Sequence, residues 1–157
     1  MVRLEIFKES DFTELNYALD ENQLQYTSTV EKALDRIKER NDGKAFAVTI
    51  FEDEKPAGFF VLDFGEDKLD LTDNEKSVLL RSFSINPGLQ GKGIGKTAMH
   101  KVGDFVKENF PYCNEIVLAV NQKNVSAYHT YLKAGYLYNG KTRIGRSGPQ
   151  YLMDKKL

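Results

Sequence analysis

The segment QGKGIGKT, residues 90–97, decides how this chain is interpreted, because it places three glycines between a strand-like run and a helix-like run. Glycine allows backbone N–H groups to approach an anion closely. The first turn of the following helix directs its unpaired N–H donors and its positive dipole end at the same point. Lys92 and Lys96 add positive charge beside the turn. The segment therefore predicts a turn that binds a phosphate or a pyrophosphate.

Two familiar glycine-rich motifs do not fit this segment. A P-loop reads G-x-x-x-x-G-K-[ST], and Gln90 stands where its first glycine belongs. A dinucleotide fingerprint reads G-x-G-x-x-G, and its third glycine would fall on Lys96. A phosphotransferase with a variant P-loop stays an alternative, but it needs an acidic magnesium ligand after another apolar strand, and the run at 115–120 is followed by Asn121. The pattern present without interruption is Q-x-x-G-x-G, from Gln90 to Gly95.

The periodicity of apolar residues predicts the order β-α-α-β-β-β-α-β-α-β-β. Strands are expected at 3–7, 44–51, 58–64, 77–85, 115–120, 136–140 and 150–154, and helices after the capping pairs Asp11–Glu14 and Ser28–Glu31, over 98–110 and from Asn124 onward. This order predicts an α/β (α+β) fold: a single mixed, mostly antiparallel sheet of about seven strands flanked by about four helices. Residues 1–157 are expected to form one domain.

Composition excludes several classes of protein. The longest apolar runs fall far short of the roughly 20 residues of a membrane span, and the N-terminus does not resemble a signal peptide, so we expect a cytoplasmic protein with no membrane partner. No basic surface interleaved with aromatic residues indicates nucleic-acid binding. Cys113 is the only cysteine, which excludes an intrachain disulfide, and His100 and His129 do not form a metal pair. No metal site is predicted.

The formal net charge of −1 hides a strong asymmetry along the chain. Residues 1–75 hold 19 acidic and 9 basic side chains, whereas residues 76–157 hold 4 acidic and 13 basic ones. Charge separated in this way favours an anionic ligand at the C-terminal half and a cationic one at the N-terminal half.

A second motif follows the glycine-rich turn. The pattern N-x-x-A-x-x-x-Y-x-K-x-G-[FY] is matched by Asn124, Ala127, Tyr131, Lys133, Gly135 and Tyr136. Together the two motifs span residues 78–136, and this segment resembles the acyl-CoA-binding region of the GNAT superfamily of N-acyltransferases. The order of elements agrees with the mixed sheet of that family.

The resemblance implies that acetyl-CoA is the cosubstrate and lies where the strands at 77–85 and 115–120 separate. Backbone groups of Phe83, Ser84 and Ile85 would bind the pantetheine arm; Gln90, Gly91, Lys92, Gly93, Ile94, Gly95 and Lys96 would hold the pyrophosphate; and Asn121, Asn124, Ala127, Tyr131 and Lys133 would complete the site. The implied reaction is direct attack of a neutral amine on the thioester carbonyl, with Tyr131 as the general acid that protonates the leaving thiolate.

The general base does not follow from the resemblance. Family members often carry a carboxylate on the strand before the turn, where this chain has Arg81 and Ser82. Glu75 or a chain of water molecules stay open as the base. The missing carboxylate also keeps a noncatalytic acyl-CoA-binding or sensor domain as an alternative.

The acceptor amine is predicted from the segment LDENQLQYTS, residues 19–28, which builds the acceptor site in the family together with the segment after the last helix. Asp20, Glu21 and Tyr26 are candidates for binding a cation, and ENQLQY is similar to the corresponding part of bacterial polyamine acetyltransferases. We therefore predict a small cationic amine such as a polyamine, with a peptide amine, an amino acid or an aminoglycoside as alternatives. A homodimer is in keeping with the family.

Overall fold

The computed structural model describes residues 1–157, and its strands and long helices follow the predicted order. The strands are β1 (Val2–Ile6), β2 (Ala45–Glu52), β3 (Lys55–Asp63), β4 (Ser77–Ile85), β5 (Glu115–Asn121), β6 (Leu137–Gly145) and β7 (Gly148–Lys156). The α-helices are α1 (Phe12–Leu15), α2 (Glu21–Leu24), α3 (Val30–Arg40), α4 (Ile94–Asn109) and α5 (Val125–Lys133). There are five α-helices instead of about four, because the segment before α3 forms two helices of a single turn. Three short 3₁₀ turns join these elements: Glu9–Asp11, Glu66–Asp70 and Pro87–Leu89.

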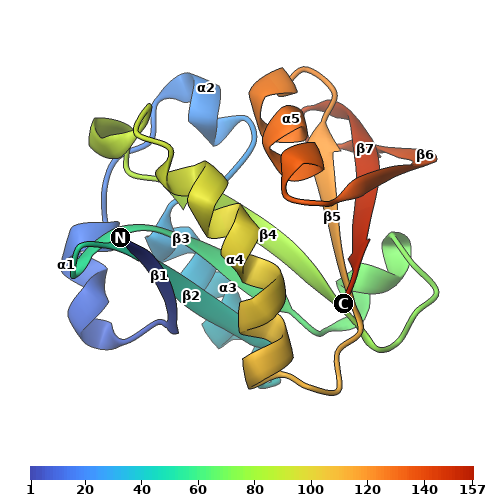
Figure 1. The fold of residues 1–157 in the computed structure, drawn as a ribbon, viewed down its shortest axis with the longest axis horizontal. Coiled ribbons are helices and arrows are strands. Elements are labelled where there is room, and N and C mark those ends of the chain that lie inside the picture. The colour runs from blue at the N-terminus through green and yellow to red at the C-terminus, as the bar shows by residue number, and fades with distance from the viewer.

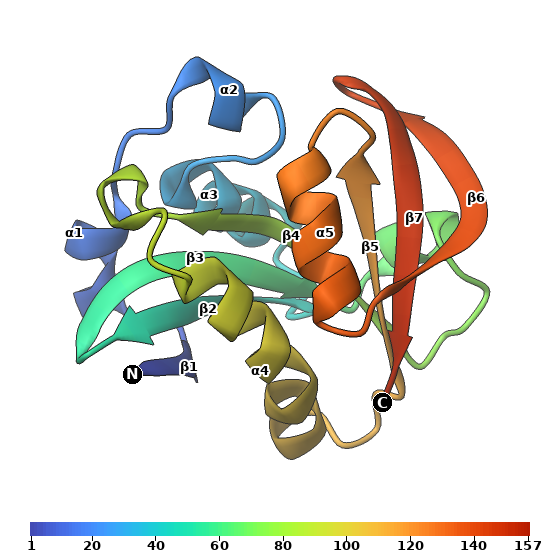
Figure 2. The same cartoon turned by 45° about the horizontal axis from the view of Figure 1, so that its top comes forward.

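The strands form one mixed sheet in the order β1-β2-β3-β4-β5-β7-β6, as Figure 1 shows. All neighbours are antiparallel except β4 and β5. That parallel pair is short: it runs only from Ser77↔Glu115 to Leu79↔Val117. Beyond Leu79 the two strands separate, which Figure 2 shows from another side.

Helices cover both faces of the sheet. The larger core cluster joins α4 to the sheet through residues such as Met99, Phe60 and Ile116. A smaller cluster on the other face joins α1 and α3 to β3 through Leu15 and Ala33. Because β3 is buried on both faces, its sequence is a continuous apolar run and does not alternate.

One predicted helix cap is wrong, and another lacks the expected hydrogen bond. The N-cap of α3 is Thr29, whose side chain accepts from the Lys32 N–H at 3.3 Å, and not Ser28. Asp11 is the N-cap residue of α1, as predicted, but its side chain does not bond to the first turn of that helix. It is buried and accepts instead from the Lys8 N–H and from Thr49 Oγ1. The predicted cap of α5 at Asn124 is confirmed.

Strands β6 and β7 are longer than predicted, with nine residues each. Their pairing continues to Gly145↔Gly148, so the hairpin carries Arg143 and Arg146 to its tip. This part of the hairpin is polar, and its sequence does not show the apolar alternation that marks a half-buried strand. No helix of the structure combines the length and the apolar character needed to cross a bilayer.

Candidate active site

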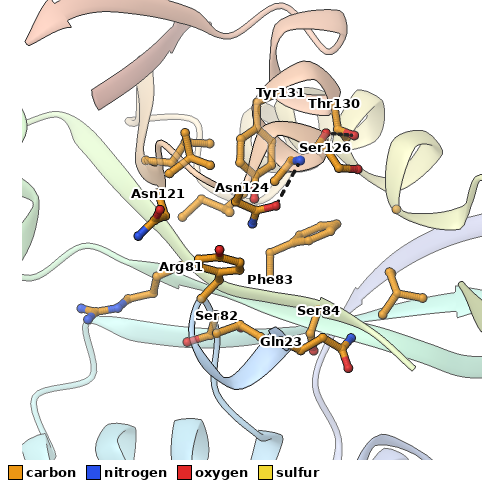
Figure 3. A pocket seen from close by; sticks show the side chains of 18 of the residues that line it. Gln23, Arg81, Ser82, Phe83, Ser84, Asn121, Asn124, Ser126, Thr130 and Tyr131 are labelled. Carbon is orange, nitrogen blue, oxygen red and sulfur yellow. Dashed lines mark hydrogen bonds between the residues drawn. The ribbon is translucent and has the colours of Figure 1, made fainter. Parts of the chain in front are cut away.

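A cavity of about 750 Å³ opens where β4 and β5 separate. Its lining comes from β4 (Leu79 to Ile85), the glycine-rich turn (Leu89, Gln90, Gly91, Gly93, Ile94, Gly95, Lys96), β5 (Leu118 to Asn121), α5 (Asn124, Ser126, Ala127, Thr130, Tyr131), the segment around α2 (Gln23, Gln25 to Ser28), α3 (Arg36) and the β6–β7 hairpin (Arg143, Gly145 to Ser147, Gln150). All the residues predicted to bind acetyl-CoA line it except Lys92 and Lys133, whose side chains are exposed outside it. The motifs therefore meet at one place, as Figure 3 shows.

Because β4 contains a β-bulge, its side chains line this cavity on both faces of the sheet. Val61 pairs with Arg81 and Phe59 pairs with Ser84, so two residues of β4, Ser82 and Phe83, oppose Phe60 alone. Ser82 has a φ of +59°, in the left-handed region. Because of this extra residue, the side chains after the bulge lie on the opposite face of the sheet from the one that regular alternation would give them.

We call the half of the cavity that faces α4 and α5 the α4 side. The half of the cavity that faces α1, α2 and α3 is the α3 side. Val78 and Leu80 pack into the α4-side core before the bulge, and Ile85 and Phe83 do so after it. Arg81 comes between these two pairs and lies on the α3 side, where Ser82 and Ser84 meet polar groups of the segment between α1 and α3. The bulge therefore gives two chemically different half-sites to one strand.

The glycine-rich turn is open on the α4 side. Gly91 and Gly93 both have φ of +80°, and a Cβ added at either would meet no atom within 4 Å. Gly93 is the N-cap of α4 and provides no side-chain cap for the first-turn N–H groups. Gln90 Nε2 donates to the carbonyl of Ile85 at 3.1 Å and so ties the turn to β4. Bare amides at the start of a 16-residue helix, with Lys96 beside them, can bind an anion.

Tyr131 lies on α5 across the cavity from Phe83 (Figure 3). Its hydroxyl has no hydrogen-bond partner within the protein, and its ring lies 6.2 Å from that of the fully buried Tyr136. Burial raises the pKa of Tyr131 to about 12. The phenol therefore stays protonated at neutral pH and is able to donate its proton to a group bound in the cavity.

The two predicted asparagines have structural partners. Asn124 Oδ1 accepts from the Ala127 N–H at 3.4 Å, which leaves its Nδ2 without a partner in the protein. Asn121 uses both ends of its amide: Oδ1 accepts from the Lys123 N–H at 2.8 Å and Nδ2 donates to the Ser147 carbonyl at 3.0 Å. Asn121 therefore holds the hairpin tip over the cavity.

A tyrosine that sequence reasoning missed contacts β4 from the α3 side. Tyr17 shares a 2.7 Å hydrogen bond with Ser84 Oγ, and burial raises its pKa to about 12. Tyr17 joins the segment before α2 to the strand next to the cavity. Its position in a nonperiodic segment gives no sequence signal for this contact.

The α2 segment and the β6–β7 hairpin meet at one end of the α3 side (Figure 2). Arg146 Nη2 donates to the Leu24 carbonyl at 2.5 Å, and Ser147 Oγ donates to the Gln25 carbonyl at 2.7 Å. Tyr26 lines the cavity as predicted. These contacts close the α3 side between segments 122 residues apart in the chain.

The predicted acidic groups do not reach this cavity, and that expectation is wrong. Asp20 is the N-cap of α2, where it accepts from the Gln23 N–H at 2.8 Å, and Glu21 is exposed; neither lines the cavity. Glu75, considered as a base, precedes β4 and lies outside the lining as well. No Asp or Glu lines the cavity.

Arg81 lines the cavity, but its guanidinium forms salt bridges with two aspartates that do not line it. Its Nη1 donates to Asp67 at 3.0 Å and to Asp63 at 3.3 Å. The Asp63 side chain is only 1% exposed and also accepts from Arg40 at 2.7 Å and from the Gly65 N–H at 2.8 Å. Burial on its own raises the pKa of Asp63, but the hydrogen bonds from Arg40 and Gly65 outweigh it and hold the pKa below its ordinary value.

Asp63→Asn is expected to lower the free energy of unfolding by about 1–3 kcal/mol, because it weakens charged hydrogen bonds to a buried group. The wild-type contribution is complete above the unfolded pKa of about 3.9 and is lost as the pH falls through the lower folded pKa. Urea unfolding at pH 7 and pH 3 checks both points. Asp67→Asn, which changes the exposed acid of the same network, is the control and should cost far less. Equal losses in the two variants would contradict this account.

Parallel strands that separate beside an uncapped helix N-terminus, with a tyrosine across the gap, are the arrangement that the resemblance implies for an acyl-CoA-dependent N-acyltransferase. The model of the Acetyltransferase (GNAT) family matches residues 8–136, and the chain belongs to this family. It is an N-acetyltransferase.

Two relatives from Bacillus subtilis (strain 168) have similar sequences. The uncharacterized N-acetyltransferase YbbJ is 34% identical over 154 residues, which cover 97% of this chain and 95% of the relative. A spermine/spermidine N(1)-acetyltransferase is 26% identical over 127 residues, which cover 81% of each chain.

Two solved structures share the fold at lower sequence identity. The spermidine N-acetyltransferase from Vibrio cholerae, in complex with CoA and spermine, has a TM-score of 0.73 at 18% identity and covers 99% of this chain and 95% of its own. The aminoglycoside acetyltransferase AAC(6')-Ib, in complex with paromomycin and acetyl-CoA, has a TM-score of 0.79 at 17% identity, with coverage of 99% and 93%. Both support the assigned fold.

Proposed function

We propose that residues 1–157 act as one domain that transfers the acetyl group of acetyl-CoA to a primary amine of a small molecule, with Tyr131 as the general acid. The observation that carries the proposal is the single cavity in which Tyr131, the unpaired edge of β4 and the open turn at Gly91 and Gly93 come together. The pyrophosphate binds at the turn, and the pantetheine arm binds along Phe83, Ser84 and Ile85. CoA-bound neighbours of the same fold are in keeping with this placement.

The reaction needs one bond to form and one to break. The amine nitrogen attacks the thioester carbonyl carbon, the carbon–sulfur bond breaks, and the thiolate takes the proton of the Tyr131 hydroxyl. The proton lost by the amine returns to the phenolate through solvent. Backbone N–H groups of β4 beyond Leu79, which have no partner on β5, polarise the carbonyl oxygen.

The rate is expected to rise with pH, because no carboxylate lines the cavity to act as a base. An alkyl ammonium loses its proton near pH 10, so kcat/KM should increase up to about that pH. It should not fall before about pH 11, because the pKa of Tyr131 is raised to about 12. A pH profile with an alkyl amine checks both limits. A plateau that begins near neutral pH would contradict the absence of a protein base.

Release of free CoA from acetyl-CoA, measured with a panel of amines, tests the proposal. The panel includes spermine, spermidine, an aminoglycoside, amino acids and a peptide amine. Stabilisation by acetyl-CoA without release of CoA with any amine would contradict the proposal and would match the noncatalytic acyl-CoA sensor kept as an alternative from the sequence. Stabilisation by ATP and not by acetyl-CoA would instead indicate the variant P-loop; a ligand at 100 times its Kd adds about 2.7 kcal/mol.

The sequence predicts a cationic amine such as a polyamine, and a spermine/spermidine acetyltransferase is among the relatives. The absence of Asp and Glu from the lining does not favour such a substrate. The proposal is therefore limited here to a primary amine of a small molecule. A homodimer, a cytoplasmic location and the absence of nucleic-acid and membrane partners stay predictions from the sequence.

A further inference from the structure

The α3 side of the cavity carries charge of one sign. Four arginines line the cavity from α3, β4 and the β6–β7 hairpin: Arg36, Arg81, Arg143 and Arg146. The only other charged lining residue is Lys96, which lies at the glycine-rich turn. The charge on the α3 side is therefore separate from the positive charge expected to hold a pyrophosphate.

Sheet alternation places the hairpin arginine on this side. Leu118 and Val120 of β5 pack into the core beneath α4, so Asn121 and its neighbour Ala119 face the other way. Asn121 pairs with Gln150 of β7, and Gln150 pairs with Arg143 of β6. Residues directly opposite each other in a ladder share a face, so Arg143 lies on the α3 side.

Three of these arginines have no acidic partner. Arg81 is neutralised by Asp63 and Asp67, whereas Arg36, Arg143 and Arg146 form no salt bridge. The contacts that hold the hairpin arginines are neutral: Arg143 Nε donates to Gln150 Oε1 at 2.8 Å, and Arg146 Nη2 donates to a backbone carbonyl. Both side chains are thus positioned while part of each guanidinium stays free.

Positive charge without a salt-bridge partner at the edge of a cavity attracts anions and repels a polycation. An arginine guanidinium also matches the planar, two-oxygen geometry of a carboxylate or a phosphate. The remaining lining of this cavity on the α3 side, including Gln23 and Tyr26, is neutral. Glu39, Asp63 and Asp67 line a separate cavity of about 290 Å³ that shares Arg36 and Arg81 with this one. A substrate with several ammonium groups and no anion would therefore leave these arginines unpaired.

We propose that the acceptor amine carries an anionic group, a carboxylate or a phosphate, that binds Arg143, Arg146 and Arg36. This inference rests on the proposed function, since it names the substrate class of the same site. The anion lies toward the hairpin tip, and the amine extends to the bulge at Ser82, where the thioester is held. The acceptor thus carries an anionic group in addition to its amine, unlike the polyamine predicted from the sequence.

Matched pairs of amines that differ in one anionic group test the proposal. Lysine and cadaverine differ by a carboxylate, and phosphoethanolamine and ethanolamine differ by a phosphate. We expect kcat/KM to be at least about tenfold higher for the anionic member of one pair, because it forms charged hydrogen bonds to the arginines. The pair that shows the larger ratio identifies the anion. Ratios near one, or a preference for cadaverine and ethanolamine, overturn the proposal.

Variants assign the effect to the arginines. Arg143→Gln and Arg36→Gln should each lower kcat/KM for the anionic substrate about tenfold and leave the affinity for acetyl-CoA unchanged. Lys141→Gln on β6 and Lys38→Gln on α3 are the matched controls, since both lysines are exposed and line no part of the cavity. Equal losses for both members of a pair, or losses in the controls, overturn the proposal.

Binding separates a failure of this inference from a failure of the proposed function. Calorimetry measures lysine, cadaverine, phosphoethanolamine and ethanolamine against the protein saturated with CoA, without turnover. If no amine releases CoA but the anionic amines bind and lose affinity in Arg143→Gln, the proposed function fails and the binding inference holds. If amines are acetylated and neither anionic amine binds better than its partner, the inference alone fails.

Discussion

Gly93→Glu is expected to abolish binding of acetyl-CoA, with an affinity loss of at least about 100-fold, or about 2.7 kcal/mol. Gly93 has a φ of +80° and stands at the start of α4, where the turn is open. A glutamate there would strain the backbone and add negative charge at the point where we place the pyrophosphate. Titration calorimetry with acetyl-CoA and with CoA measures the loss.

The control for this variant is Gly43→Glu. Gly43 also has a positive φ, +69°, with no atom within 4 Å of an added Cβ, but it follows α3 and does not line the cavity. A glutamate at this position imposes similar backbone strain and adds the same charge, but away from the cavity. Normal affinity in Gly93→Glu, or an equal loss in Gly43→Glu, would remove the pyrophosphate site from the turn.

Tyr131→Phe is expected to lower kcat by about 100- to 10,000-fold, the usual contribution of a general acid, while the Kd of acetyl-CoA changes little. The substitution removes only a hydroxyl that has no partner within the protein, so packing against Tyr136 is retained. Single-turnover rates at saturating acetyl-CoA measure the chemical step.

Tyr128→Phe is the matched control on the same helix. Tyr128 packs against Tyr151 and does not line the cavity. The Tyr128→Phe substitution should therefore leave kcat unchanged. A normal rate in Tyr131→Phe would take this phenol out of the mechanism, and equal losses in both variants would indicate a general role of α5 in stability.

The sequence predicts well the part of the fold that contains the glycine-rich turn and the second motif. The bounds of β4, 77–85, were predicted without error, because proline and glycine end the strand. Asn124 and the glycine-rich turn are local signals, since the residues that make each of them are neighbours in the chain. The register of the second motif then leads to Tyr131, which no local physical argument distinguishes from Tyr128.

The α3 side could not be predicted in the same way. Its arginines stand at positions 36, 81, 143 and 146, and only sheet pairing and a long-range loop contact bring them together. Counting charge by halves of the chain predicted a cationic ligand, because it treated every acid as free. In the structure Asp11, Asp20 and Asp63 are engaged in hydrogen bonds within the fold.

The extra residue in β4 also bears on how such an enzyme changes over generations. Because the bulge turns Arg81 and Phe83 to opposite faces, substitutions on one face leave the other intact. Mutation can then alter which amine is acetylated while the thioester donor continues to be used. We expect enzymes with such a strand to diverge during evolution into families that use the same thioester donor and acetylate different amines.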